Sequence, residues 1–301
     1  MRVFVTGATG HLGSAVVPAL LRSGHEVVGL ARSDASVAAL TALGAGVRRG
    51  DLDDLDGLRD AASEADGVVH LAFKHDAAFA GDVAGAAGAD LAAVRAFADA
   101  LAGTGKALVG VSETAALAGL GRTGTEDDDV LDAGPRAAAR ATVLGLAVGG
   151  ARSSVVALPP VVHSTLDKHG FIPTLIGIAR AAGVSGYVGD GANRWPAVHT
   201  LDAGRLFRLA LEGAPAGSRL HAVGDEGVPF RQIAETIGRH LGVPTARIPA
   251  EEAKAHFGFL ARLLTLDNPT SSALTQRRLG WEPVHSGLIA DLDLGHYFAT
   301  G

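Results

Sequence analysis

The chain has 301 residues, of which 48% are hydrophobic, and a formal net charge of -6. This length permits one large domain or two closely joined ones, and the scattered charges of both signs argue against nucleic acid or an anionic membrane as the main partner, so a small molecule is expected. The absence of cysteine excludes disulfides and thiolate metal sites and is compatible with a reducing cytosol.

Short β-branched runs alternate with longer alanine- and leucine-rich segments through the first half of the chain. The runs predict strands at residues 3–5, 26–30, 46–49, 67–71, 107–111 and 153–158, and the segments between them predict helices at 12–23, 36–43, 55–62, 90–101 and 136–148. Strand, helix, strand at this rhythm predicts an α/β fold, a doubly wound parallel sheet with helices on both faces.

The rhythm changes after residue 158. Frequent prolines punctuate shorter elements there, among which helices are predicted at 173–182, 202–212, 230–241 and 271–279. We therefore expect residues 1–158 to form the sheet domain and residues 159–301 to form a smaller C-terminal lobe, with the option of returning a strand to the main sheet.

Neither targeting nor membrane insertion is expected from the sequence. The opening MRVFVTGATG lacks the basic segment and long apolar stretch of a signal peptide. No run approaches the roughly eighteen uninterrupted apolar residues of a membrane span, and the histidines and acidic residues show no metal-ligand spacing. We expect a cytoplasmic protein without a bound metal.

The first predicted strand runs into a glycine motif, VFVTGATGHLGSAVV. Glycine permits a positive φ in the tight turn and lets the backbone approach a pyrophosphate, and the following helix N-terminus offers free N–H groups to the phosphates. The motif therefore predicts a Rossmann-like dinucleotide site, although glycines can also serve helix-strand packing alone. The cofactor-binding residues expected in this loop are Gly7, Thr9, Gly10, His11, Leu12 and Gly13.

The residue after the second strand distinguishes the two nicotinamide dinucleotides. A carboxylate there binds the ribose hydroxyls of NAD, and an arginine accommodates the 2′-phosphate of NADP. The sequence VVGLARSD presents Arg32 first and Asp34 further along, so NADP(H) is expected in preference to NAD(H), the alternative being a solvated surface arginine. After the third strand, RRGDLDD places Asp51 and Leu52 beside the expected adenine, unless the carboxylate only caps a strand end.

Five motifs, in their order along the chain, resemble the short-chain dehydrogenase/reductase superfamily: TGATGHLG, GDLDD, VVHLAF, VGVSETAAL and VGDGANRWPAVHTLDAGRLFRLALE. They are most similar to its extended or atypical branch, the NAD-dependent epimerase/dehydratase type, over almost the whole chain. The resemblance implies a sheet that carries the cofactor, a C-terminal lobe that closes over the substrate, and hydride transfer at the nicotinamide. It also implies that Ala72 and Phe73, in VVHLAF, lie at the cofactor and that a homodimer can form.

In this superfamily a tyrosine and, four residues later, a lysine stand beside the nicotinamide with a hydroxyl residue from the preceding strand end. Thr114, in VSETAAL, resembles the hydroxyl residue that orients the carbonyl; the alternative is a hydroxyl that only ends the strand. The tyrosine is absent, since Tyr187 and Tyr297 both lie in the C-terminal half. In DAGPRAAARATVLG, Asp132 is nearest the tyrosine position and Arg136 nearest the lysine position. Arg136 can hold ribose hydroxyls, but a guanidinium with a pKa above 12 is a poor acid.

Histidine is the natural replacement acid, because its pKa lies near neutral pH. His75 follows the fourth predicted strand and His163 follows the sixth, so both are expected at the carboxyl edge of the sheet, near the cofactor. For His75 the alternative is a solvated loop.

The sequence thus favours an NADP(H)-dependent oxidoreductase that acts on a small carbonyl or hydroxyl compound. Its candidate catalytic residues are Thr114, Arg136, His75 and His163. The missing tyrosine and lysine keep two alternatives open: a non-catalytic NADP(H)-binding sensor, and a sugar-type epimerase or dehydratase.

Overall fold

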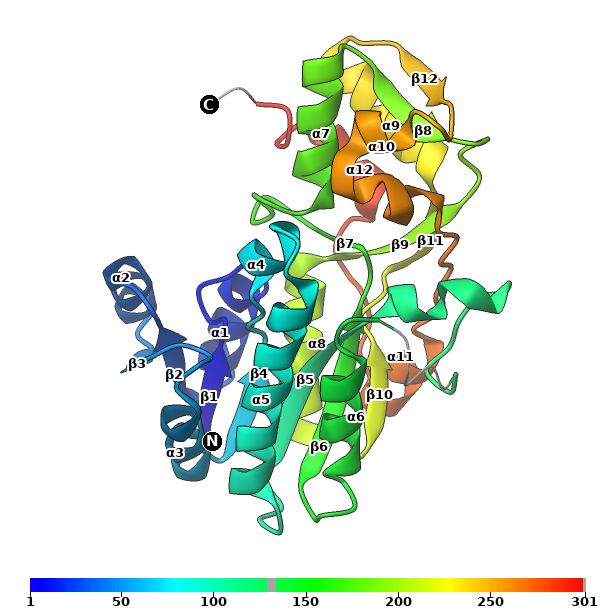
Figure 1. The fold of residues 1–301 in the computed structure, drawn as a ribbon. Coiled ribbons are helices and arrows are strands. Elements are labelled where there is room, and N and C mark those ends of the chain that lie inside the picture. The colour runs from blue at the N-terminus through cyan, green and yellow to red at the C-terminus, as the bar shows by residue number, and fades with distance from the viewer. Residues whose placement is uncertain (129–133, 300–301) are drawn as a thin grey trace.

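The central sheet of the molecule has seven parallel strands in the order β10-β6-β5-β4-β1-β2-β3. A computed structural model describes residues 1–128 and 134–299, and Figure 1 shows the strands of the sheet side by side beneath a second lobe. The predicted doubly wound parallel sheet is confirmed, as is each predicted strand of the first half. The strands are β1 (Arg2–Thr6), β2 (Glu26–Ala31), β3 (Gly46–Arg49), β4 (Gly67–His70), β5 (Ala107–Glu113), β6 (Arg152–Leu158) and β10 (Ser218–His221).

Helices cover both faces of this sheet (Figure 1). Because successive side chains of a strand point to opposite faces, Val3 and Val5 pack into one core while Phe4 packs into the other. The first core is closed by α1 (Gly13–Arg22), α2 (Asp34–Ala42) and α8 (Thr200–Gly213), and the second by α3 (Leu55–Glu64), α5 (Val83–Leu101) and α6 (Ala137–Gly145).

Two of these helices differ from their predicted ranges. Helix α5 begins at Val83, ahead of the predicted residue 90, because the Asp82 carboxylate caps it by accepting from Gly85 N at 2.8 Å. The short α4 (His75–Phe79) precedes it. Helix α6 is shorter than predicted, and Arg136 is its N-cap residue.

The second lobe has its own core around Trp195 and Phe230. Its elements are β7 (Val161–His163), β8 (Ser185–Val188), β9 (Arg194–His199), β11 (Asp225–Pro229), β12 (Thr245–Ile248), α7 (Phe171–Ala182), α9 (Phe230–Leu241), α10 (Ala253–Phe257), the 3₁₀ helix η2 (Gly258–Thr265) and α12 (Leu288–Asp293). β11, β9 and β7 form one small sheet, and β12 and β8 another. The 3₁₀ helix η1 (Thr114–Leu120) and α11 (Ala273–Leu279) complete the fold.

The chain after residue 158 contributes to both lobes. Strand β10 pairs with β6 in the main sheet, and α8 fills the first core with Leu206, Phe207 and Leu211. Trp281 enters the same core and donates its indole N–H to Asp202 O at 2.9 Å. The division of the chain into two domains at residue 158 remains a prediction. Segments from both sides of that residue contribute to the core on the α8 face of the main sheet.

No helix in the described ranges is long and apolar enough to cross a membrane.

Replacing Trp281 by alanine is expected to lower the free energy of unfolding by about 3–5 kcal/mol, because a fully buried indole leaves a cavity. Urea denaturation followed by circular dichroism measures the change. Val284→Ala, at a side chain that is 63% exposed, is the control and should change stability by less than about 0.5 kcal/mol. Equal stability of the two variants would show that Trp281 does not anchor the core.

Candidate functional site

The glycine loop between β1 and α1 leaves no room for side chains. Gly7 has φ +66°, and a Cβ placed on it would lie 2.8 Å from Ala72 N. A Cβ on Gly13 would lie 2.2 Å from Gly7 O. Both contacts are closer than real Cβ atoms approach, so the turn depends on glycine at these two positions.

The same loop presents unused backbone donors. Within residues 1–128 and 134–299, the N–H groups of His11, Leu12 and Gly13 have no protein acceptor. They stand at the positive end of α1, beside the point where the strand order reverses between β1 and β4. Free donors at a helix N-terminus and glycines at the tight positions of the loop fit the pyrophosphate of a dinucleotide. His11, Leu12 and Gly13 are the residues that would hold it.

Arg32 follows the end of β2 and directly precedes Ser33, the N-cap residue of α2. Arg32 is exposed and has no partner in the described part of the chain. Ser33 Oγ caps α2 by accepting from Ser36 N at 3.2 Å, and Thr9 Oγ1 lies 3.3 Å from Ser36 Oγ, so the glycine loop adjoins this corner. The Asp34 carboxylate is paired with Arg49 of β3.

The two residues expected beside the adenine have different surroundings. Asp51 Oδ1 accepts from Asp53 N at 2.8 Å, which turns the loop after β3. The Leu52 side chain is buried in the core on the α3 side of the sheet. Lys74 binds Asp53 with Nζ–Oδ distances of 2.6 and 2.7 Å and so ties this loop to the segment after β4.

Beneath the glycine loop lies a buried polar network centred on Asp90 of α5. Asp90 accepts two hydrogen bonds from Arg136, Nε to Oδ2 at 3.0 Å and Nη2 to Oδ1 at 2.6 Å. His70 Nε2 lies 3.1 Å from Asp90 Oδ1, and His70 Nδ1 lies 2.6 Å from Thr6 Oγ1. Thr6 Oγ1 also accepts from Ala72 N at 3.2 Å. The network therefore joins β1, β4, α5 and the start of α6.

Aromatic rings extend this network toward the second lobe. The Arg136 guanidinium lies over the Phe73 ring, 5.1 Å from its centroid, and the Phe73 and His75 rings are 5.1 Å apart. Burial, together with the positive charge of Arg136, lowers the pKa of His75. Beyond it, Phe79 contacts Phe259 of the second lobe with 5.2 Å between the rings.

The hydroxyl residue Thr114 and a glutamate that the sequence analysis did not single out, Glu113, lie at the end of β5. Thr114 is fully buried, and its Oγ1 accepts from Asn268 Nδ2 at 3.0 Å. Arg140 Nη1 donates to Ser112 Oγ at 3.3 Å. Between these hydroxyls, Glu113 keeps Oε2 buried without a hydrogen-bond partner. Asp132, the residue expected near the tyrosine position, lies outside the described residues.

His163 lies in the second lobe, not among these groups. Its ring is fully buried, and Nδ1 lies 2.9 Å from Asp291 Oδ2. Its backbone carbonyl accepts from Thr200 Oγ1, which in turn lies 2.8 Å from His11 Nε2. A chain of hydrogen bonds thus connects the glycine loop to the second lobe.

The two tyrosines are engaged elsewhere. Tyr297 OH accepts from Ser164 N at 3.1 Å and donates to Asp167 Oδ2 at 3.2 Å. The Tyr187 ring lies 5.5 Å from the Arg231 guanidinium. Neither contacts Thr114 or Arg136 in the described ranges, so neither takes the place of the missing tyrosine.

Sequence reasoning missed Thr6, His70, Asp90, Glu113 and Asn268. One signal was available, because Asp90 is the single charged residue between 83 and 94, in a run of alanine, glycine and apolar residues. A lone acid on an apolar helix is buried only with a partner.

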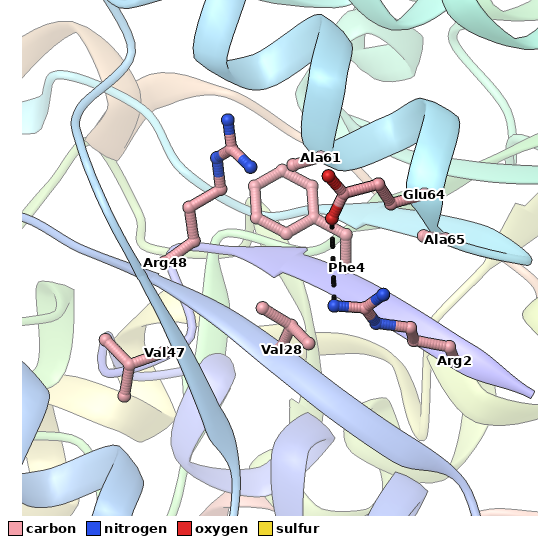
Figure 2. A pocket seen from close by; sticks show the side chains of 8 residues that line it. All are labelled: Arg2, Phe4, Val28, Val47, Arg48, Ala61, Glu64 and Ala65. Carbon is pink, nitrogen blue, oxygen red and sulfur yellow. Dashed lines mark ion pairs between the residues drawn. The ribbon is translucent and has the colours of Figure 1, made fainter.

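A hollow lies apart from this site, beside α3 where β1 begins (Figure 2). Its polar groups neutralise one another. Arg2 pairs with Glu64 at 3.7 Å, as the dashed line in Figure 2 marks, and Arg48 pairs with Asp60 at 3.8 Å. In the described chain no group of His, Cys, Asp and Glu is arranged to hold a metal ion.

Replacing Asp90 by asparagine is expected to cost about 3–5 kcal/mol of unfolding free energy, since Arg136 would be left buried without its counter-charge. Burial opposes ionisation of Asp90, but its hydrogen bond from His70 and the charge of Arg136 hold its pKa at about 2. That value lies below the roughly 3.9 of an unfolded aspartate, so the contribution is present at neutral pH and is lost as pH falls from about 4 toward 2.

Urea denaturation at pH 7 and at pH 3 measures both effects of the Asp90→Asn change. Asp56→Asn, at a side chain that is 93% exposed and paired with Arg59, is the matched control. A loss of stability in Asp90→Asn no larger than in this control would refute the network's structural role.

The comparisons with known proteins agree with this geometry. Residues 3–222 match the sequence model of the NAD dependent epimerase/dehydratase family. An uncharacterized protein of Schizosaccharomyces pombe is 47% identical over 299 residues, 99% of this chain and 100% of the relative. The 2-alkyl-3-oxoalkanoate reductase of Stenotrophomonas maltophilia is 30% identical over 258 residues, 81% of this chain and 77% of the relative.

Solved structures share the fold at low sequence identity. A dTDP-glucose 4,6-dehydratase from Streptomyces venezuelae with NAD bound superposes with a TM-score of 0.76 at 23% identity, covering 97% of this chain and 96% of the other. A nucleoside-diphosphate-sugar epimerase from Pseudomonas aeruginosa gives 0.75 at 22% identity, with 98% and 99% covered. The resemblance predicted from the motifs is confirmed: the chain belongs to the NAD dependent epimerase/dehydratase family, whose members are NAD(P)-dependent enzymes.

Proposed function

We propose that the protein is an NADP(H)-dependent oxidoreductase that transfers hydride between the nicotinamide and a small carbonyl or hydroxyl compound. The observation that carries the proposal is an intact dinucleotide cradle combined with an unpaired arginine at the end of β2. The cofactor supplies the hydride when bound, and this chain's residues hold it, orient the substrate oxygen and provide a proton.

The preference for NADP(H) rests on charge at the corner of β2 and α2. Arg32 has no partner in the described ranges, and the carboxylate of Asp34 is already paired with Arg49. Arg32 directly precedes Ser33, the N-cap residue of α2. A phosphate on the 2′-oxygen would meet a cation and helix N–H groups there, whereas the neighbouring carboxylate, Asp34, is engaged by Arg49 and not by ribose hydroxyls.

Thr114 is the proposed orienting hydroxyl. Asn268 donates to its Oγ1 and leaves the hydroxyl hydrogen free to donate in turn to a substrate oxygen. Arg136 is proposed to steady the nicotinamide end of the cofactor through its position over Phe73. Because Arg136 gives two hydrogen bonds to Asp90 and a guanidinium group is a poor acid, Arg136 is not the proposed proton donor.

A relative with a named activity supports redox chemistry on a carbonyl. The Stenotrophomonas maltophilia relative is named as a reductase of 2-alkyl-3-oxoalkanoates, and we extend to this chain only the class of reaction. A second candidate, a non-catalytic NADP(H) sensor, is favoured by the absence of the tyrosine and lysine pair. Binding of NADP(H) without turnover of any carbonyl compound would decide for that candidate.

Titration of the purified protein with NADPH and NADH is expected to show tighter binding of NADPH. Arg32→Ala should weaken NADPH binding roughly tenfold or more, the effect of losing one charged hydrogen bond, and leave NADH binding unchanged. Fluorescence of the reduced nicotinamide measures both affinities. Arg22→Ala, in the last turn of α1 at the opposite edge of the sheet, is the control. Tighter binding of NADH by the unmodified protein would contradict the proposed preference.

A panel of ketones, aldehydes and 3-oxo acids with NADPH is expected to include at least one substrate. On that substrate Thr114→Val should lower kcat roughly 100- to 1000-fold, as when one donor to a developing oxyanion is removed, while NADPH affinity stays the same. Thr41→Val, at an exposed hydroxyl on α2 that bonds only Val37 O, is the control. Equal kcat in the two variants would remove Thr114 from the mechanism.

A further inference from the structure

Glu113 is a partly buried acid next in the chain to the proposed orienting hydroxyl residue. It is the last residue of β5 and directly precedes Thr114, at the carboxyl edge of the sheet where β1 and β4 also end. Gly134, just before α6, closes over it, since a Cβ on that glycine would lie 3.4 Å from Glu113 Oε2. The carboxyl group therefore lies against the segment that leads into the helix carrying Arg140, with Arg136 as its N-cap residue.

Within residues 1–128 and 134–299, the Glu113 carboxyl group forms no ion pair, and its Oε2 is buried and accepts no hydrogen bond. The nearby guanidinium groups bond other atoms: Arg136 gives two hydrogen bonds to Asp90, and Arg140 donates to Ser112. Burying a carboxyl oxygen without a hydrogen-bond donor costs much free energy when the group is ionised and much less when it is protonated.

The charges facing Glu113 come from two helices. Arg136 and Arg140, at the start of α6, favour the ionised form, whereas Asp90 of α5 favours the protonated form. Burial outweighs the two arginines and raises the pKa of Glu113 above its ordinary value. A carboxyl group with a raised pKa keeps its proton to higher pH than a solvated one, which suits it better to general acid catalysis.

We propose that Glu113 supplies the proton that a tyrosine supplies in related enzymes. This role rests on the proposed oxidoreductase function. In the reductive direction the carbonyl carbon gains a hydride from the reduced nicotinamide, the carbonyl oxygen gains the proton of the Glu113 carboxyl group, and the products are an alcohol, the oxidised cofactor and a Glu113 carboxylate. Solvent then returns the proton to the carboxylate.

The two histidines considered from the sequence fit this step less well. His163 is buried in the second lobe with Nδ1 held by Asp291. His75 starts an exposed helix, with its ring beside Phe73 and Phe79, and Arg136 disfavours its protonated form. Glu113 is adjacent to Thr114 in the chain, so proton donor and orienting hydroxyl come from one strand end.

The protonation state of Glu113 is tested first, without any substrate. The infrared carbonyl band of a protonated carboxyl group is followed against pH in the unmodified protein and in Glu113→Gln. We expect a band that is absent from Glu113→Gln and that titrates closer to neutral pH than the roughly 4.3 of a solvated glutamate. Glu26→Gln, at a side chain that is 70% exposed, should leave this band in place. A midpoint at or below 4.3 overturns the proposal.

Kinetics then test the proton transfer. On a substrate from the carbonyl panel, Glu113→Gln should lower kcat roughly 100-fold or more, the size of a general acid contribution, with NADPH affinity within twofold. Glu113→Asp should recover part of kcat with a shifted pH profile, and Glu26→Gln should behave as the unmodified enzyme.

The outcomes separate the two proposals. An active enzyme whose kcat and pH profile are unchanged in Glu113→Gln overturns the role of Glu113 and leaves the oxidoreductase intact. A protein that binds NADPH and reduces none of the panel overturns the oxidoreductase, and the role of Glu113 fails with it.

Discussion

Asp90 can remain ionised inside the protein only because Arg136 and His70 hydrogen-bond to it. An isolated carboxylate at this depth would cost several kcal/mol, and the two partners offset that cost with three hydrogen bonds. Through His70 the constraint reaches Thr6, the residue that ends β1 immediately before the glycine loop. The position of the dinucleotide loop, the end of β4 and the start of α6 therefore depend on one buried charge.

The same interaction explains how the site tolerates an arginine where relatives carry acid-base residues. A guanidinium free in the cleft would attract anions and repel protonated groups, but Arg136 lies between a carboxylate and the face of Phe73. Its two hydrogen bonds go to the Asp90 carboxylate, which carries the opposite charge. What remains near Thr114 is a carboxyl group, Glu113, so the polarity of the site differs from that of a tyrosine-lysine pair.

The strands, the glycine loop and Arg32 were predictable because each depends on local sequence: β-branched runs, a tight turn, and one residue after a strand. The Asp90 network was not, because Arg136 lies 46 residues beyond its partner and meets it only after α5 and α6 pack. The position of Arg136 in the sequence predicts that it lies near the start of a helix. The packing of the helices is needed to show that its guanidinium points at Asp90. Glu113 was overlooked for a related reason, since burial, not residue type, gives it an unusual proton affinity.

The return of the chain to the main sheet limits how such a protein can be recombined. Strand β10 and helix α8 both come after residue 158, yet they complete the sheet and the first core of the cofactor-binding half. A chimera joined at that residue to the second half of a distant relative would have to supply a matching outer strand and a matching helix face. The second lobe is therefore inherited together with part of the main sheet and its core, and in this architecture loops are easier to exchange than halves.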